Sequence, residues 1–173
     1  MQSKFTTKKE RKPFSFWKEK ILWKICILLV ILGAYLCSRF FFQVMLIQGK
    51  SMEPTYHNFQ FVILDKHTQT YNTGDVLAFK CPTLHATLVK RVVGVPGDTV
   101  YISDEILYVN GEISTVYPKD KFSYAGILSY PIVLGESEYI LIGDNYTISK
   151  DSRYETVGVV SKTQIIGKIV LPQ

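Results

Sequence analysis

The sequence is poor in cysteine, proline and glycine, with 3, 7 and 11 of these residues among 173. So few prolines and glycines, together with 47% hydrophobic and 20% charged residues, exclude a collagen-like or low-complexity chain and favour a folded protein of about one domain. Cys26 and Cys37 lie in an N-terminal apolar run, so no disulfide can form within the rest of the chain. We predict that Cys81 is a partly buried free thiol.

Beyond its N-terminal segment, the sequence has no excess of basic residues. Of a net charge of +5, residues 1–24 supply +6, from eight lysines and arginines against two glutamates, which leaves −1 for the other 149 residues. A basic surface spread over a folded domain would suggest nucleic-acid binding, whereas here the charge belongs to one short tail. Nucleic acid is therefore not a predicted partner.

A continuous apolar run follows the basic tail. From Ile21 to Phe42 only two charged residues and one serine interrupt it, and its 22 residues would extend about 33 Å as a helix, enough to cross a bilayer core. The bulky residues after Ala34 supply no cleavage site for a removable signal peptide. Since flanking basic residues stay on the cytoplasmic side, we predict a single-pass protein of the cell membrane, in contact with membrane lipid. Its predicted parts are a cytoplasmic tail, 1–20, a transmembrane helix, 21–42, and an extracytoplasmic domain, 43–173.

Beyond residue 42 the pattern changes to short segments rich in valine, isoleucine, tyrosine and phenylalanine, separated by turn residues. Asn110-Gly111, between two such segments, is the strongest hairpin signal. Residues 117–137 show no regular pattern and are predicted to form a loop or flap. The predicted fold is mainly β: one N-terminal transmembrane helix followed by an antiparallel, barrel-like β domain. The predicted strands are 59–64, 76–79, 88–95, 99–102, 106–109, 139–142, 158–160 and 165–171.

A serine and a lysine carry the candidate chemistry. Ser51 lies in a turn bracketed by Gly49 and Pro54, shortly after the apolar run, so its hydroxyl is expected near the outer membrane surface. Lys90 and Arg91 stand side by side in an apolar strand segment, and because alternate side chains point to opposite faces, one of the two must point inward. A desolvated lysine can act as a base near neutral pH. No spacing marks any histidine as the base that a nucleophilic serine needs; these are His57, His67 and His85.

Four segments resemble, in order, those of type I signal peptidases, the membrane-anchored serine proteases that remove signal peptides from exported proteins. With the tail and the apolar run, the resemblance covers nearly the whole chain, and the absence of a large inserted domain resembles Gram-positive members. The matching segments are Ser51 to Thr55, Gly74 to Val76, Lys90 to Asp98, and Gly143 to Asn145 continuing through Ser149 to Arg153.

The resemblance implies that Ser51 is the nucleophile and Lys90 the general base of an acyl-enzyme mechanism without metal or cofactor. Ser149 then looks like the hydroxyl that orients the Lys90 amine, and Met52 like the apolar residue beside the nucleophile. Asp144, Asp151 and Arg153 match family positions that hold the framework of the site, and the resemblance implies that Asp151 and Arg153 pair with each other.

Two residues depart from the family pattern. Gly49 stands where some members have a serine that donates a hydrogen bond to the oxyanion, and Tyr146 stands where many have an arginine. An Asn145-Tyr146-Thr147 glycosylation pattern carries no meaning in a bacterial-looking chain, and the segment from Asp144 to Asp151 lacks the ligand spacing of a calcium loop.

The implied substrates are pre-proteins whose signal peptides end in small residues such as Ala-x-Ala, held extended against a strand edge in a shallow apolar pocket. Two alternatives are open. One is a signal peptidase dedicated to a few pilus or surface proteins, and the other is a non-enzymatic, membrane-tethered assembly chaperone.

Overall fold

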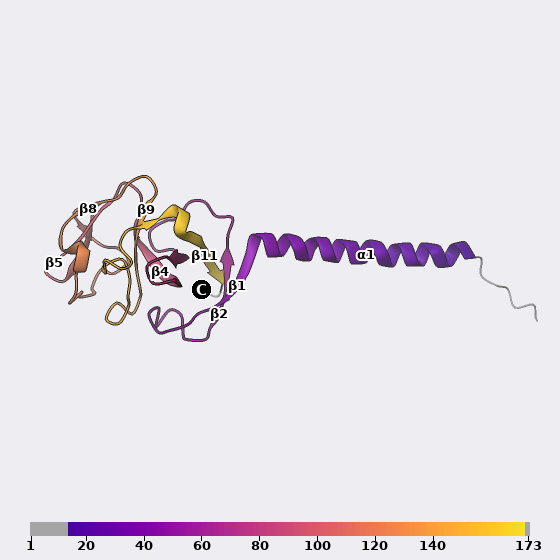
Figure 1. The fold of residues 1–173 in the computed structure, drawn as a ribbon, viewed down its shortest axis with the longest axis horizontal. Helices are drawn as coiled ribbons and strands as arrows, with labels where there is room; N and C mark the ends of the chain where they lie inside the picture. The colour runs from indigo at the N-terminus through magenta and orange to yellow at the C-terminus, as the bar shows by residue number, and fades with distance from the viewer. Residues whose placement is uncertain (1–13, 172–173) are drawn as a thin grey trace, which may run out of the picture. The chain divides into compact units, whose positions relative to one another are not determined.

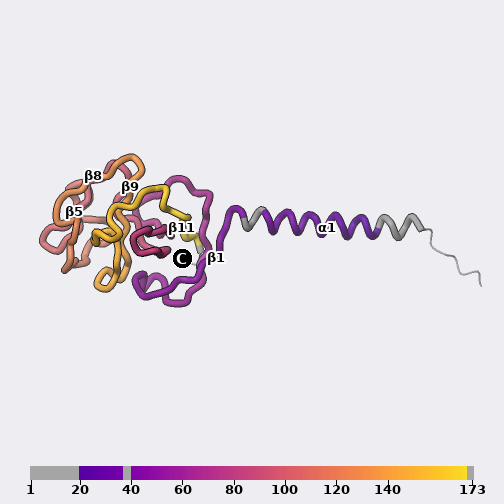
Figure 2. The backbone as a smooth tube through the Cα atoms, viewed as in Figure 1, coloured from indigo at the N-terminus to yellow at the C-terminus, as the bar shows by residue number. Residues whose placement is uncertain are grey.

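The computed structural model of the chain describes the backbone of residues 14–171, and their side chains except for those of residues 14–19, 37–39 and 171. Figure 2 draws the residues outside this description in grey. Most of the predicted tail over 1–20 and the side chain of Cys37 are outside it. The chain separates into two compact units, Met1–Phe40 and Phe41–Gln173.

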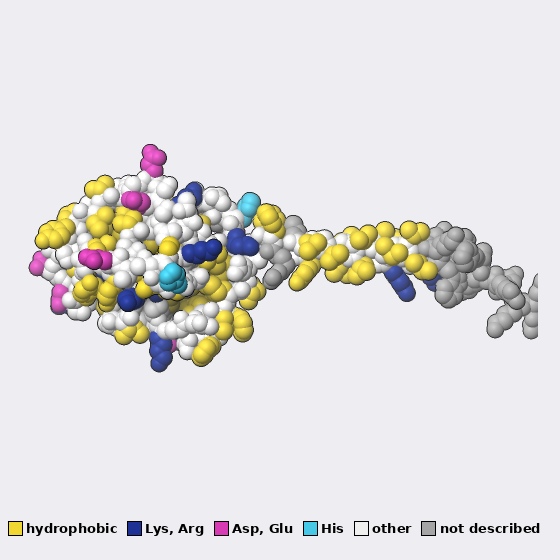
Figure 3. Space-filling view, viewed as in Figure 1, with side chains coloured by type: hydrophobic (Ala, Val, Ile, Leu, Met, Phe, Trp, Pro, Cys, Tyr) yellow, Lys and Arg dark blue, Asp and Glu magenta, His cyan; other side chains and the backbone are white. Residues whose placement is uncertain are grey.

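Among its described residues, the first unit consists of helix α1, which spans Phe14–Phe41 and so ends one residue past the boundary between the units. Its large apolar side chains are exposed from Ile21 to Leu36, with Val30 71% exposed, and Figure 3 shows them along the helix. Within the described residues, however, no helix reaches the combination of length and hydropathy that defines a membrane span. The transmembrane helix over 21–42 is therefore not confirmed and stays a prediction.

The second unit consists of two sheets in which every recorded strand pair is antiparallel. Figure 1 shows β5 and β8 at the opposite side of this unit from β1 and β2. In spatial order, the seven-stranded sheet contains β1 (Phe42–Leu46), β2 (Phe61–Asp65), β11 (Ile165–Leu171), β3 (Val76–Cys81), β4 (Ala86–Gly94), β9 (Glu138–Ile142) and β10 (Val160–Ser161). The four-stranded sheet contains β7 (Glu112–Ile113), β6 (Ile106–Val109), β5 (Thr99–Ser103) and β8 (Ile132–Val133). Two short 3₁₀ helices, η1 (Gly126–Ser129) and η2 (Lys162–Gln164), complete the unit.

The prediction of a mainly β, antiparallel fold is confirmed, and each predicted strand overlaps an observed one. The hairpin at Asn110-Gly111 forms, with φ of 55° and 83° at these two residues, as a tight hairpin turn requires. The structure differs in having two sheets where one barrel-like sheet was predicted. It also adds β1, which the preceding apolar run concealed, and it places η1 and β8 inside the predicted loop 117–137.

The hydrophobic core fixes the loops that carry the candidate site. Ile47, Met52 and Tyr56, from the segment between β1 and β2, are buried against Val62 and Leu64 of β2. Burial of an apolar side chain of this size stabilises the fold by roughly 1.5–3 kcal/mol. The turn that contains Ser51 is therefore held by the core on both sides of the serine.

Candidate active site

Ser51 lies in a turn that hydrogen bonds hold at both ends. The backbone N–H of Ile47 donates to the carbonyl of Gln60 at 2.9 Å, and that of Phe59 donates to the carbonyl of Ile47 at 2.8 Å. The carbonyl of Ser51 itself accepts a hydrogen bond from the backbone N–H of Asn145 at 3.0 Å. The turn is thus tied to the loop after β9, which contains another of the matching segments.

Lys90 lies in the middle of β4, where its backbone pairs with Leu77 of β3. Its side chain is only 2% exposed, and its Nζ lies 2.6 Å from the Oγ of Ser51. Lys90 is thus the residue of the Lys90-Arg91 pair that points inward. A protonated amine donates this hydrogen bond, and a neutral one can accept it from the hydroxyl.

Burial changes the acidity of this lysine. Desolvation lowers the pKa of Lys90 from 10.5 to about 8, although the negative charges of Asp151 and Asp144 raise it and the positive charge of Arg153 lowers it further. At pH 7 about one lysine in ten is then neutral, compared with fewer than about one in a thousand for a free lysine. Burial therefore gives this site a population of neutral amine near neutral pH.

The same change predicts how stability depends on pH. Since the folded-state pKa of Lys90 is about 8 and the unfolded one 10.5, only the unfolded chain keeps the proton between these values, and the free energy of unfolding rises with pH there. Below about pH 8 both states are protonated and the full penalty, about 3 kcal/mol, is constant. We expect the stability of Lys90→Met relative to the wild type to be about 2 kcal/mol lower at pH 10 than at pH 7.

Urea unfolding at the two pH values measures this difference. Lys80→Met is the matched control, because Lys80 is exposed on the neighbouring strand β3, and its relative stability should not change with pH. The same relative stability of Lys90→Met at both pH values would contradict the lowered pKa.

Ser149 lies beside the turn that contains Ser51 but does not hydrogen bond to Lys90. Its side chain is buried, and its Oγ has no hydrogen-bond partner among the described residues. A Cβ on Gly143 would lie 2.2 Å from Ser149 Oγ and 2.5 Å from the Ser51 carbonyl oxygen. Only glycine fits at position 143, and this close packing brings Ser149 next to Ser51.

Asp151 and Arg153 form a buried ion pair, as the sequence suggested. Arg153 Nε donates to Asp151 Oδ1 at 2.8 Å, and the exposed fractions of the two side chains are 2% and 0%. Arg153 also donates to the carbonyls of Tyr146 at 2.7 Å and Tyr124 at 3.3 Å. The backbone N–H of Gly143 donates to Asp151 Oδ2 at 3.2 Å, so the pair fixes the conformation of the loop from 143 to 153.

Asp144 belongs to a second ion pair, with Arg91. Arg91 Nε donates to Asp144 Oδ1 at 2.7 Å, and the hydroxyl of Tyr117 donates to the same oxygen at 2.9 Å. Burial alone would raise the pKa of Asp144, but hydrogen bonds from Arg91, Thr55 and Tyr117 and the charge of Arg91 lower it overall. Neither Arg91 nor Tyr117 was predicted to belong to the site. The position of Arg91 next to Lys90 in an apolar strand was a signal that could have indicated its role, whereas nothing in the sequence marked Tyr117.

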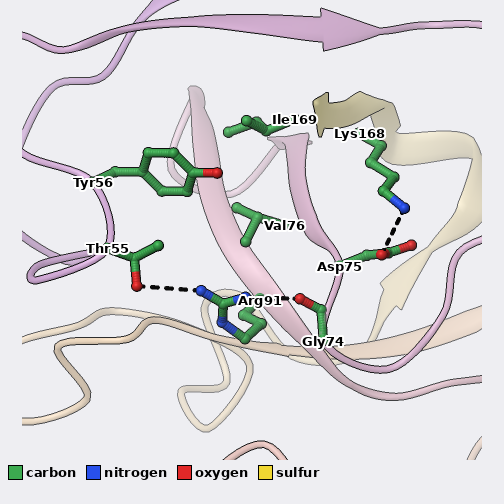
Figure 4. A pocket seen from close by; sticks show the side chains of 8 residues that line it. All are labelled: Thr55, Tyr56, Gly74, Asp75, Val76, Arg91, Lys168 and Ile169. Carbon is green, nitrogen blue, oxygen red and sulfur yellow. Dashed lines mark hydrogen bonds and ion pairs between the residues drawn. The ribbon is translucent and has the colours of Figure 1, made fainter. Parts of the chain in front are cut away.

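Besides a cavity of about 520 Å³ that is lined by Arg91, Tyr117 and Asp144, two further cavities border β4. One, of about 310 Å³, contains Arg91, which donates to the carbonyl of Gly74 and to the hydroxyl of Thr55, as Figure 4 shows. It contains neither Ser51 nor Lys90. The other, of about 550 Å³, contains both, and most of its remaining wall is apolar: Met45, Leu46, Ile47, Met52, Ala86, Leu88, Val89 and Ile166, with Gln43, Gln48 and Thr87.

The two departures from the family pattern have clear local structures. Gly49 has a φ of +101°, which favours glycine, and its backbone N–H donates to Asn58 Oδ1 at 2.8 Å. The ring of Tyr146 packs against Phe122, with centroids 4.7 Å apart, and against Tyr117 at 6.2 Å. Gly49 therefore supplies no side-chain donor to the site, and Tyr146 belongs to an aromatic cluster behind it.

Other candidate groups lie outside this arrangement. Cys81 is buried and free, and its thiol donates weakly to the Thr156 carbonyl at 3.5 Å. Among the side chains that the structure describes, no three of the His, Cys, Asp and Glu types meet in a way that could hold a metal ion. The histidines are all exposed: His57, His67 and His85.

The chain belongs to the family described as signal peptidase, peptidase S26, whose model matches residues 19–173. It is 30% identical to a signal peptidase I of Bacillus licheniformis over 84% of this chain and 83% of the relative, and 31% identical to signal peptidase I S of Bacillus subtilis over 87% of each. A signal peptidase IB of Staphylococcus aureus is 30% identical over 88% of each chain. A crystal structure of a signal peptidase I from Enterococcus faecalis is 25% identical, with a TM-score of 0.47, over 58% of this chain and 97% of that one.

The predicted family and the predicted enzyme class, a serine endopeptidase of the signal peptidase type, are thereby confirmed. Family membership supports the cleavage of signal peptides and favours an enzyme over the alternative of a non-enzymatic assembly chaperone.

Proposed function

We propose that the chain cleaves N-terminal signal peptides from pre-proteins, with Ser51 as the nucleophile and Lys90 as the general base. The observation that carries this proposal is the 2.6 Å separation of Lys90 Nζ and Ser51 Oγ. That distance is within the reach of direct proton transfer, and burial supplies the neutral amine that the transfer requires.

The reaction follows from these two groups. Neutral Lys90 accepts the proton of Ser51 as Oγ attacks the scissile carbonyl carbon, which forms a tetrahedral intermediate. The intermediate collapses as protonated Lys90 gives its proton to the leaving amine of the mature protein. Water, deprotonated by Lys90, then hydrolyses the ester of Ser51 and releases the signal peptide. The backbone N–H of Ser51 is the oxyanion donor in this proposal, because the N–H of Gly49 is already bonded to Asn58.

Supporting roles go to the residues around the pair. Met52, 1% exposed, anchors the nucleophile turn. Asp144, Asp151 and Arg153 hold the loop after β9, whose Asn145 N–H binds the Ser51 carbonyl. For Ser149, an unpartnered buried hydroxyl against that turn supports the role of orienting the Lys90 amine once substrate engages Ser51.

The substrate in this proposal is an extended peptide with small side chains near the cleavage site. Residues Ala86–Val89 of β4 pair with β3 on one side, while β9 pairs with β4 only from Arg91 onward. In the described part of the chain, the first half of β4 thus has an open edge along the 550 Å³ cavity, to which a peptide strand can add. The apolar wall of that cavity suits alanine-sized side chains.

Membrane attachment is a further part of the proposal, with the predicted division into tail 1–20, membrane segment 21–42 and extracytoplasmic domain 43–173. The exposed apolar side chains of α1 support it. So does the first strand pair of the catalytic unit, where Phe42, Val44 and Phe61 are 47%, 59% and 67% exposed. These residues share one face, because Phe61 pairs with Leu46 and side chains two apart on a strand point the same way.

Purified protein incubated with a precursor whose signal peptide ends in Ala-x-Ala tests the function, with the new N-terminus determined by mass spectrometry. We expect one cleavage by the wild type and a loss of at least about 10³-fold in rate for Ser51→Ala. Ser103→Ala, an exposed serine on β5, is the matched control and should cleave normally. Cleavage that survives in Ser51→Ala would refute the proposal. A parallel comparison of precursors of pilus subunits with precursors of other exported proteins determines the range of substrates.

A further inference from the structure

Lys90 has to release a proton although the charges of two carboxylates act on it. The negative charges of Asp144 and Asp151 favour the protonated amine, and Arg153 opposes it. Each carboxylate is bound by an arginine, Asp144 by Arg91 and Asp151 by Arg153. How strongly these partners hold the carboxylates therefore affects how readily Lys90 becomes neutral.

Tyr117 binds one of these carboxylates from a segment that the mechanism does not otherwise use. It is 6% exposed, and its hydroxyl donates to Asp144 Oδ1 at 2.9 Å, with the Ile142 carbonyl at a longer 3.4 Å. Its ring packs edge-on against Phe122, centroid to centroid 5.7 Å, and against Tyr146. The phenol is thus fixed in position, with its hydroxyl directed at the last residue of β9 and at Asp144 in the loop that follows.

The carboxylate of Asp144 is oriented by a set of donors on one side of β4. Oδ1 accepts from Arg91 Nε and Tyr117, and Oδ2 accepts from Arg91 Nη2 at 2.5 Å. Because Lys90 and Arg91 are consecutive in the strand, their side chains lie on opposite faces of it. Each donor that binds Asp144 on the Arg91 face makes the carboxylate a weaker partner for the Lys90 ammonium.

We propose that Tyr117 is a positioning residue, whose hydroxyl holds the carboxylate of Asp144 on the Arg91 side of β4 and thereby keeps Lys90 easy to deprotonate. This rests on the proposed role of Lys90 as the base. Burial, the negative charge of Asp144 and the hydrogen bond to Asp144 raise the pKa of Tyr117, and the charge of Asp151 adds to this effect. The positive charge of Arg91 opposes it, but the pKa is raised overall. The phenol therefore keeps its proton and remains a hydrogen-bond donor throughout the pH range of the assay.

The test is Tyr117→Phe, which removes the hydroxyl and keeps the ring. We expect the acid limb of kcat/KM to move up by about 0.5 pH unit, so that activity at pH 7 falls about threefold while the alkaline plateau changes less than about twofold. Titration of Lys90 in the same full-length protein, followed by NMR of ¹³Cε-labelled lysine, should show the same upward shift. A purely structural role would lower activity equally at every pH.

Controls separate this inference from the proposed function. Tyr139→Phe alters another buried tyrosine, which packs against Tyr71 near the start of β9, whereas the loop with Asp144 follows the end of that strand, and it should leave both profiles unchanged. If Tyr117→Phe does not fold, Thr55→Val removes another hydroxyl that binds Asp144 and should shift Lys90 in the same direction. In an Asp144→Asn background, Tyr117→Phe should cause no further shift.

The cleavage assay and the Lys90 titration test the proposed function and the role of Tyr117 separately. A wild type that does not cleave any precursor refutes the proposed function, while the NMR titration still decides the role of Tyr117. A Lys90 titration that moves in neither Tyr117→Phe nor Thr55→Val overturns the inference, even if the wild type is a fully active peptidase.

Discussion

Lys90→Arg is expected to lower kcat/KM by at least about 10³-fold, although arginine keeps the positive charge and the approximate bulk of lysine. The reason is that a guanidinium does not release its proton in the pH range of the assay, whereas Lys90, with a pKa lowered to about 8, does. A role limited to binding or packing would tolerate this change far better. The rate on a short Ala-x-Ala peptide, with folding checked by circular dichroism, measures it.

The pH profile of the wild type belongs to the same prediction. Below about pH 8, kcat/KM should rise about tenfold per pH unit as Lys90 becomes neutral, and it should then level off until another group titrates. Any residual activity of Lys90→Arg should lack this limb. Lys80→Arg, at an exposed position of β3, should reproduce the wild-type profile. A limb that persists in Lys90→Arg would show that a different residue is the base.

Arg153→Met is expected to lower the free energy of unfolding by about 3–5 kcal/mol. The change leaves the carboxylate of Asp151 buried, at 0% exposure, without its counter-charge. It also removes the donors to the carbonyls of Tyr146 and Tyr124 and the contact of the guanidinium with the Phe122 ring, 5.4 Å from its centroid. Because this pair holds the loop whose Asn145 binds Ser51, the peptidase activity should fall as well.

Urea unfolding at pH 7 measures the loss, and two further variants interpret it. The double variant Asp151→Asn with Arg153→Met should recover part of the stability, since it no longer leaves the carboxylate of residue 151 buried without its counter-charge. Lys168→Met removes an ion pair with Asp75 in which the lysine is 29% exposed, and it should cost less than about 1 kcal/mol. A loss in Arg153→Met no larger than that of Lys168→Met would show that the buried pair is not a main stabilising element.

Local signals explain why so much of the strand pattern was predictable. Alternating apolar residues and turn residues such as Asn110-Gly111 act within a few positions, so the sequence indicated each of the main strands. Where local signals conflict, prediction was wrong or incomplete. Phe42 was assigned to the end of the apolar run, so the strand from Phe42 to Leu46 was missed. The segment 117–137 owes its order to distant contacts, since Phe122 and Leu128 are buried against β5, β6 and β9.

For the candidate site, the sequence alone determined the residue types and their order, namely Ser51 in a glycine- and proline-bounded turn and Lys90 beside Arg91 in an apolar strand. Which of the two charges is buried, and how far its pKa falls, depends on desolvation by the whole core, and only the tertiary structure decided it. The partners of the carboxylates are equally non-local: Arg91 and Asp144 are 53 residues apart in sequence, and Tyr117 and Asp144 are 27 apart. Such pairings follow from strand register and loop packing, which no short segment of the sequence specifies.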